Sequence, residues 1–487
     1  MVIGCILLFQ TTNAQNFDFN TNCKNAYNLI MQLRLDEAKK LIATEKSDHP
    51  DNLISVFLEN YSDCVLIIAN EDETDLTTLL PNKDKRLAQL SKGNKDSPWF
   101  KYTQAEVNLQ WAFAQLKFEQ YYDSFFEIKK GYNLLTENQK QFPDFKENNK
   151  TLGLIHAVIG TVPDNYKWAA NFLGFNGTIT QGISELQTVI DEQPKSIFYN
   201  ETLYIYLFLR MHLMNQPLDA WKVVSAKGFP DSSTDELACF LKADIAQHCG
   251  LNEEAITILS NRNFPKYTLN FYFLDYLLGE SKLNRLDEDA NVSLQKFVNE
   301  FHGRNYLKDA YQRTAWYYLL HDDQKQYEYY IGFCKTKGAT LTDHDQLAKQ
   351  EAESGIKPNI TLLRSRLLCD GGYYEKALNE LLSKHVSDFT SVQDKIEYIY
   401  RLARIYHLWN KVDQSMVYYN ATIEMGKSFP YYYAANAALN LGYIYEQKGN
   451  TTEAKKYFQM CLDMKNTDYK TSIAQKAKAG LNRLEGK

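Results

Sequence analysis

Glycine and proline are scarce in this chain, with 22 and 11 among 487 residues. All-β folds and loop-rich enzymes need these residues for their turns, so the scarcity favours helices joined by short connections. The eight cysteines include no CxxC motif and no paired Cys/His spacing, so nothing indicates a zinc site. On a helix, Cys239 and Cys249 would lie nearly three turns apart, too far for a disulfide. We therefore expect mostly small, buried thiols.

A stripe of Lys and Arg is also missing, and the formal net charge is −6. Because binding to phosphates requires such a stripe, we expect no nucleic-acid partner. No segment after the N-terminus approaches 18 consecutive apolar residues, so we expect no transmembrane span in the mature chain. The chain has no phosphate-binding loop, GxSxG elbow or HExxH motif. We expect no catalytic residue, no cofactor and no bound metal.

The N-terminus carries one short apolar run, VIGCILLF, which is too short to cross a bilayer. Thr12 and Ala14 are small residues at the −3 and −1 positions of a cleavage site before Gln15. This pattern predicts a signal peptide over residues 1–14 and an exported protein, periplasmic or associated with the outer membrane. VIGC also fits a lipoprotein box, so lipid attachment at Cys5, with peripheral membrane association, is an alternative.

Pairs of residues about twelve positions apart, most of them small, recur along the chain. The clearest is Gly442 with Ala454, in AALNLGYIYEQKGNTTEAKKYFQMCLDM (437–464), where two helical patterns flank QKGN. Small residues there let two antiparallel helices pack closely, while Tyr445 and Phe458 fill the remaining space. The other pairs are Ala26/Ala38, Ala170/Gly182, Phe208/Ala220, Ala243/Ala255, Gly279/Ala290, Ser365/Ala377 and Ala403/Ser415. This spacing predicts a series of helix hairpins, interrupted by a longer step around residues 338–357.

The 437–464 unit resembles the tetratricopeptide repeat (TPR), with L-G-x-x-Y in its first helix, a turn Gly and A-x-x-x-F in its second. The matching residues are Leu441, Gly442, Tyr445, Gly449, Ala454 and Phe458. Ala438 and Asn466 stand where the pattern has Trp and Pro. The resemblance implies an all-α fold, a right-handed superhelix (α-solenoid) of TPR-like helix hairpins. We expect irregular helical hairpins over 15–150, a TPR-like array over 151–337, a connecting segment over 338–357 and a C-terminal TPR array over 358–487.

The aromatic segment FHGRNYLKDAYQRTAWYYLL (301–320) fits the same register. With Ala315 at the small position, Tyr311 and Tyr318 become packing residues, and Tyr327 follows twelve residues later. NYLKDAY (305–311) and FLGFNGTITQGISEL (172–186) are similar to a family of TPR-type proteins. That family has eukaryotic outer-mitochondrial-membrane and inclusion-clearance members and secreted bacterial relatives. The similarity implies an adaptor that catalyses no reaction.

In the TPR pattern, positions 2, 5, 9 and 12 of each first helix face a concave groove. On this register the groove residues are Trp316, Leu319, Arg366, Tyr400, Arg404, His407, Tyr443 and Glu446. Aromatic and Arg side chains often anchor interfaces, and Arg366 and Arg404 are suited to carboxylates of a bound peptide. The sequence therefore predicts a non-enzymatic scaffold in the cell envelope that binds a protein or peptide partner in its groove. For each residue, plain solvated surface is the alternative.

Two other functions fit parts of the sequence. A glycan-binding outer-membrane lipoprotein of the SusD type, which also uses TPR hairpins, suits the export signal and the many aromatic residues. A helical-toroid glycoside hydrolase would need two carboxylates a few ångströms apart. Acids occur in LDEDA (286–290) and NEDETD (70–75), although both segments also fit helix caps or turns. His344, flanked by Asp343 and Asp345, suggests a metal ligand, but a solvated loop explains it more simply.

Overall fold

The computed structural model describes residues 16–161, 174–266, 268–465 and 468–485. These residues form 25 α-helices and one 3₁₀ turn, η1 (Val386–Asp388), and contain no β-strand. The all-α fold predicted from the sequence is confirmed. No helix in these ranges is long and apolar enough to cross a membrane. The predicted signal peptide and the lipoprotein box with Cys5 lie outside the described residues, and so do Ala170 and Asn466.

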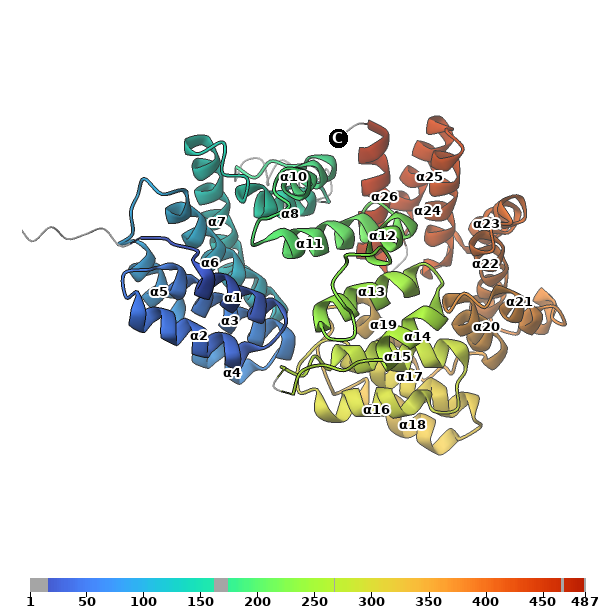
Figure 1. Ribbon diagram of the computed structural model, residues 1–487. Coiled ribbons are helices and arrows are strands. Elements are labelled where there is room, and N and C mark those ends of the chain that lie inside the picture. The colour runs from blue at the N-terminus through green and yellow to red at the C-terminus, as the bar shows by residue number, and fades with distance from the viewer. Residues whose placement is uncertain (1–15, 162–173, 267, 466–467, 486–487) are drawn as a thin grey trace, which may run out of the picture. The chain divides into compact units, whose positions relative to one another are not determined.

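The chain divides into two units, the first made of residues up to 68 with 74–148, and the second of 69–73 with 149–487. The helices in and around the first unit are α1 (Thr21–Met31), α2 (Leu35–Asp48), α3 (Ile54–Asn70), α4 (Glu73–Leu79), α5 (Asn82–Leu90), α6 (Pro98–Lys117) and α7 (Tyr121–Gln141). Helices α6 and α7 form a long hairpin, drawn in blue to teal in Figure 1. Gly131 permits their close approach, since a Cβ there would lie 2.5 Å from Leu109.

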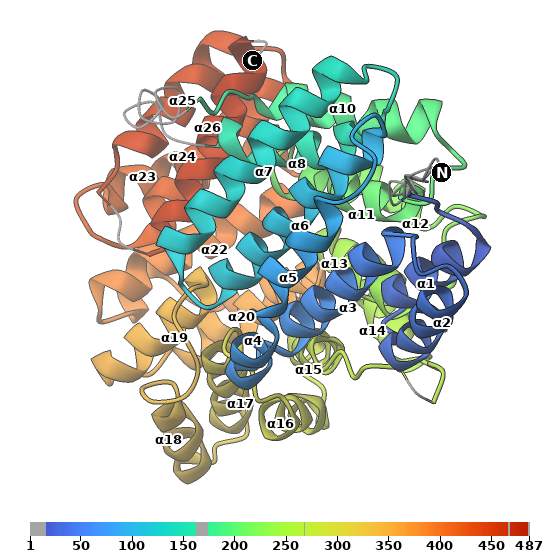
Figure 2. The same ribbon diagram turned by 90° about the vertical axis from the view of Figure 1, so that its left-hand side faces the viewer.

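The second unit is a series of helix hairpins packed in chain order (Figures 1 and 2). It starts with α8 (Asn148–Gly160) and α10 (Ile179–Glu192). The next four hairpins are α11 (Tyr199–His212) with α12 (Pro217–Val224), α13 (Glu236–His248) with α14 (Asn252–Ser260), α15 (Phe273–Arg285) with α16 (Ala290–Glu300), and α17 (Leu307–Leu320) with α18 (Gln324–Phe333). After α19 (Asp343–Ser354) come α20 (Ile360–Asp370) with α21 (Tyr374–Leu381), α22 (Val392–Leu408) with α23 (Val412–Gly426), α24 (Tyr432–Gln447) with α25 (Thr451–Asp463), and finally α26 (Lys470–Glu485).

Most hairpins close on the predicted pairs of residues about twelve positions apart. Both members are buried in Ala26/Ala38, Ala243/Ala255, Gly279/Ala290, Ala315/Tyr327, Ser365/Ala377, Ala403/Ser415 and Gly442/Ala454. The Ser365 hydroxyl donates a hydrogen bond to the Ala377 carbonyl at 2.9 Å, so these two helices touch directly. The prediction for Phe208 is wrong, because that ring is 41% exposed. Gly182 packs closely against the backbone of Gly153 on α8.

Helix α19 occupies the predicted connecting segment and packs against α17. Its Asp345 is fully buried and accepts hydrogen bonds from the backbone N–H groups of Tyr306 (2.7 Å) and Lys308 (3.0 Å). A carboxylate at this place satisfies the otherwise unpaired N–H groups that begin α17. Thr342 caps α19 in turn. His344 therefore lies in the first turn of a helix, and the loop expected there is wrong.

Helix α26 brings the end of the chain back to the beginning of the second unit. Asn482 donates to the Gly160 carbonyl at 2.9 Å, and Arg483 donates to the Leu213 carbonyl at 3.0 Å. Arg483 also forms a salt bridge of 2.7 Å with Glu446 of α24. Helix α26 thus joins the last hairpin of this unit to its first helices, a contact that the repeat pattern did not predict.

Candidate functional site: the inner cavity

The concave side of the second unit holds a cavity of about 1010 Å³, which we call the inner cavity. Its wall comes mainly from the first helices of successive hairpins, together with α26. Aromatic rings that line it include Phe240, Phe273, Tyr276, Tyr400, Tyr432 and Tyr469. The Arg and Lys residues of the lining are Arg313, Arg366, Arg401, Arg404 and Lys476, and its carboxylates are Asp244, Glu280 and Asp370.

The structure brings half of the predicted groove residues together. Arg366, Tyr400, Arg404 and His407 all line the inner cavity. They come from α20 and α22, two first helices in consecutive hairpins, which is why the repeat register placed them on one face. Their binding role stays a prediction.

The other four groove residues lie elsewhere. Trp316 borders a neighbouring pocket, with the Arg366 guanidinium 5.0 Å from its ring centre. Leu319 is buried in the core. Tyr443 is also buried, and Glu446 is engaged by Arg483 of α26. These last two positions face a helix of the chain itself.

Each carboxylate of the lining has a basic partner. Glu280 pairs with Arg313 at 2.7 Å, Asp244 with His248 at 3.3 Å, and Asp370 with Arg366 at 3.7 Å. Arg401 pairs at 2.6 Å with Glu397, a carboxylate outside the lining. Three of the five Arg and Lys residues are thereby neutralised.

The remaining two cations, Arg404 and Lys476, form no salt bridge with a carboxylate in the described parts of the chain. The Lys476 side chain is exposed, and the surrounding helices together with the charge of Arg404 lower its pKa. Burial lowers the pKa of His407 to about 4, and Arg404 contributes. Desolvation is the main cause of both shifts, and the charge of Arg404 adds to each of them.

Two histidines, His212 on α11 and His248 on α13, also line the cavity. Burial lowers the pKa of His212 to about 4, with His248 and Lys476 adding to the effect. Burial also lowers the pKa of His248, but the charge and hydrogen bonds of Asp244 outweigh it and leave that pKa raised. Sequence reasoning missed Lys476, His212 and His248, because no repeat pattern indicates that α26 faces α11 and α13.

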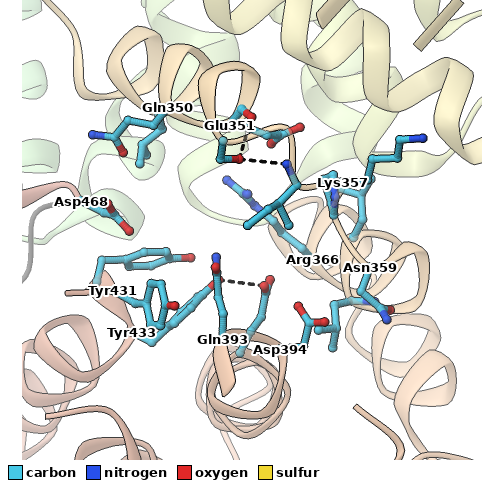
Figure 3. A pocket seen from close by; sticks show the side chains of 18 of the residues that line it. Gln350, Glu351, Lys357, Asn359, Arg366, Gln393, Asp394, Tyr431, Tyr433 and Asp468 are labelled. Atoms are coloured by element: carbon cyan, nitrogen blue, oxygen red, sulfur yellow. Dashed lines mark hydrogen bonds between the residues drawn. The ribbon is translucent and has the colours of Figure 1, made fainter. Parts of the chain in front are cut away.

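A second hollow, the lateral pocket, has a volume of about 390 Å³ and shares His344, Arg366, Tyr432 and Tyr469 with the inner cavity. Figure 3 shows Glu351 and Arg366 facing Tyr431, Tyr433, Gln393 and Asp394 across it. Glu351 accepts hydrogen bonds from Trp316 Nε1 (3.0 Å) and Gln312 Nε2 (2.7 Å), and burial raises its pKa to about 7. Glu351 thereby fastens α19 to α17.

The acidic segments considered for catalysis do not converge in either hollow. In LDEDA, Asp287 pairs with Arg285 at 2.6 Å and Asp289 with Lys282 at 2.5 Å, within the α15–α16 turn. In NEDETD, Glu73 begins α4. His344 lies 3.6 Å from Asp309, and the described ranges contain no group of three His, Cys, Asp or Glu side chains suited to a metal ion. Within the same ranges every cysteine, including Cys239 and Cys249, is a free thiol.

Residues 435–468, which include most of α24 and all of α25, match the family model of the tetratricopeptide repeat. The fold and this match define the protein as an all-α helical-repeat protein with a TPR in its C-terminal part. No curated protein sequence matches the chain.

Similar solved structures include the TPR domain of P58(IPK), with 14% identity, 84% of this chain and 96% of that chain covered, and a TM-score of 0.22. Yeast Tom70 has 11% identity, coverage of 95% and 96%, and a TM-score of 0.23. The lytic transglycosylase Slt from Pseudomonas aeruginosa has 11% identity, coverage of 93% and 72%, and a TM-score of 0.22. With TM-scores this low, none of the three supports a functional inference.

Proposed function

We propose that this chain is a non-enzymatic scaffold that binds an extended segment of a protein partner in the inner cavity. The observation that carries the proposal is the lining itself, in which aromatic and Arg side chains from successive hairpins converge on one cavity. These residue types dominate the binding energy of protein interfaces. The volume of about 1010 Å³ lies at the upper end of the range for small-molecule pockets, which suits a peptide segment.

Two apolar side chains of the wall are available to a partner. Phe208 is 41% exposed and Leu218 is 62% exposed, and both line the inner cavity. Because neither is needed in the core, they are candidates for contact with a bound segment. Their substitution therefore tests binding without disturbing the fold.

A pull-down from cell-envelope extract tests this function with a double variant, Phe208→Ala with Leu218→Ala. The matched control is Tyr329→Ala with Val417→Ala, which removes side chains that are 58% and 67% exposed outside the cavity. We expect the cavity variant to recover much less partner than wild type, and the control to recover the same amount. Equal recovery by all three proteins would reject the inner cavity as the binding site.

The proposal includes export from the cytoplasm, supported by the apolar run and the small residues Thr12 and Ala14 before Gln15. Membrane association through a lipid on Cys5 is the alternative route to the envelope. Cell fractionation distinguishes the two, since only the lipidated form would pellet with membranes.

The lateral pocket supports glycan binding as a second candidate function. Tyrosines, an amide and carboxylates meet there, as Figure 3 shows for Tyr431, Tyr433, Gln393 and Asp394. Affinity electrophoresis against a panel of polysaccharides tests this candidate, with Tyr431→Ala as the variant. Absence of retardation on every glycan would reject it.

A further inference from the structure

We propose that the segment bound in the inner cavity is acidic, and that Arg404 of α22 and Lys476 of α26 together receive its carboxylates. This inference rests on the proposed function and deepens it by naming the chemistry of the partner. Neither helix alone forms the site, because Arg404 lies on α22 and Lys476 on α26, and both side chains line the inner cavity.

The first support is the charge balance of the wall. The lining contains five Arg and Lys residues and three carboxylates, and every one of those carboxylates pairs with a cation or histidine other than Arg404 and Lys476. Asp370 also acts on Arg404, but its salt bridge is with Arg366. Asp343 acts on Lys476 from beyond salt-bridge distance. Two positive charges therefore share one cavity without an anion of their own.

The second support is the surroundings of these two cations. Arg404 lies beside the rings of Tyr400 and Tyr419 and lowers the pKa of His407. None of these neighbours supplies negative charge at neutral pH. The charge of Arg404 acts on Lys476, so the two cations repel each other, and a bound anion would remove that repulsion.

The geometry favours a peptide over a small free anion. Arg presents a planar fork that holds a carboxylate through two hydrogen bonds, while Lys acts as a point charge that tolerates several positions. The same wall carries Tyr432 and Tyr469, which suit the apolar parts of a chain. A cavity of about 1010 Å³ is far larger than one carboxylate or phosphate group requires.

Fluorescence anisotropy with the purified full chain tests this inference. The probes are a labelled, capped peptide of repeated Glu, Ala and Tyr residues and its counterpart with Gln in place of Glu. We expect the acidic peptide to bind at least tenfold more tightly, with an affinity that falls as salt is added. Lys476→Gln should weaken binding of the acidic peptide by about tenfold, and Lys476→Arg should preserve that binding.

The matched control is Lys470→Gln, which removes an exposed charge on the same helix outside the cavity and should leave binding unchanged. Arg404→Gln with Lys476→Gln should abolish the preference for Glu over Gln, with the melting temperature measured to confirm folding. Equal binding of the two peptides, or no binding of either, would overturn the acidic site. Inorganic phosphate that binds as tightly as the acidic peptide would also overturn it, in favour of a small anion.

Failure of this inference is distinguishable from failure of the proposed function. If the acidic site is wrong but the scaffold is right, the two peptides bind equally and the Phe208 and Leu218 variant still loses its partner in the pull-down. If the proposed scaffold function is wrong, the Phe208 and Leu218 variant recovers as much partner as the wild type.

Discussion

The substitution Gly442→Leu tests the packing on which the C-terminal hairpin depends. Gly442 lies on α24 opposite the fully buried ring of Phe458, and a Cβ there would stand 2.5 Å from two ring carbons. The ring cannot retreat toward α26, because a Cβ at Gly480 would also stand 2.5 Å from it. Phe458 therefore fills the space between two glycines, and any side chain at Gly442 must displace it.

We expect Gly442→Leu to lower the free energy of unfolding by about 1–3 kcal/mol through overpacking. The better helix propensity of Leu offsets roughly 0.8 kcal/mol of this loss. Urea unfolding followed by circular dichroism measures the change. Adding Phe458→Leu should recover part of the stability, because the smaller side chain relieves the clash.

Gly332→Leu is the matched control, since nothing lies within 4 Å of a Cβ at that helical glycine. It should raise stability by about 0.5–1 kcal/mol through helix propensity alone. Unchanged stability of Gly442→Leu would refute the packing of Phe458 between α24 and α26, and with it the hairpin register.

Three further predictions concern α19, α26 and the N-terminus. The pKa of Glu351 is raised to about 7, so its contribution to stability is present below its unfolded pKa and is lost as the pH rises through about 7. We expect a loss of roughly 1–3 kcal/mol in the free energy of unfolding, measured by urea unfolding across this pH range. Glu351→Gln should flatten this decline. A pH dependence equal to that of wild type would contradict this. Arg483→Ala should destabilise α26 by about 1–3 kcal/mol, because it removes the salt bridge to Glu446 and the hydrogen bond to the Leu213 carbonyl. Hydrogen exchange in α26 should become faster. Unchanged exchange would show that α26 docks by other contacts. Mass spectrometry of the mature protein should find Gln15 at its N-terminus, whereas a lipidated Cys5 would point to the alternative cleavage.

The local part of this fold was predictable from the sequence. A hairpin is made by residues about twelve positions apart, so the pairs Ser365/Ala377, Ala403/Ser415 and Gly442/Ala454 leave a pattern that can be read directly. The same register placed Arg366, Tyr400, Arg404 and His407 on the lining of one cavity.

The closure of the cavity was not predictable in this way. Asn482 bonds to Gly160 and Arg483 to Leu213, contacts that join distant parts of the chain and follow no period. Lys476 reaches the cavity only through this closure. Asp345 and Glu351 were missed for a related reason, since α19 lies outside the repeat and its contacts with α17 are set by tertiary packing.

Site-specific photocrosslinking in living cells tests the central claim most directly. A benzophenone amino acid at Phe208 places the reactive group in the inner cavity, and the same amino acid at Tyr329 places it on an exposed site elsewhere. The scaffold function predicts that irradiation yields a discrete protein adduct from Phe208 and none from Tyr329. Adducts from Tyr329 alone, or the same adducts from both positions, would contradict binding in the inner cavity.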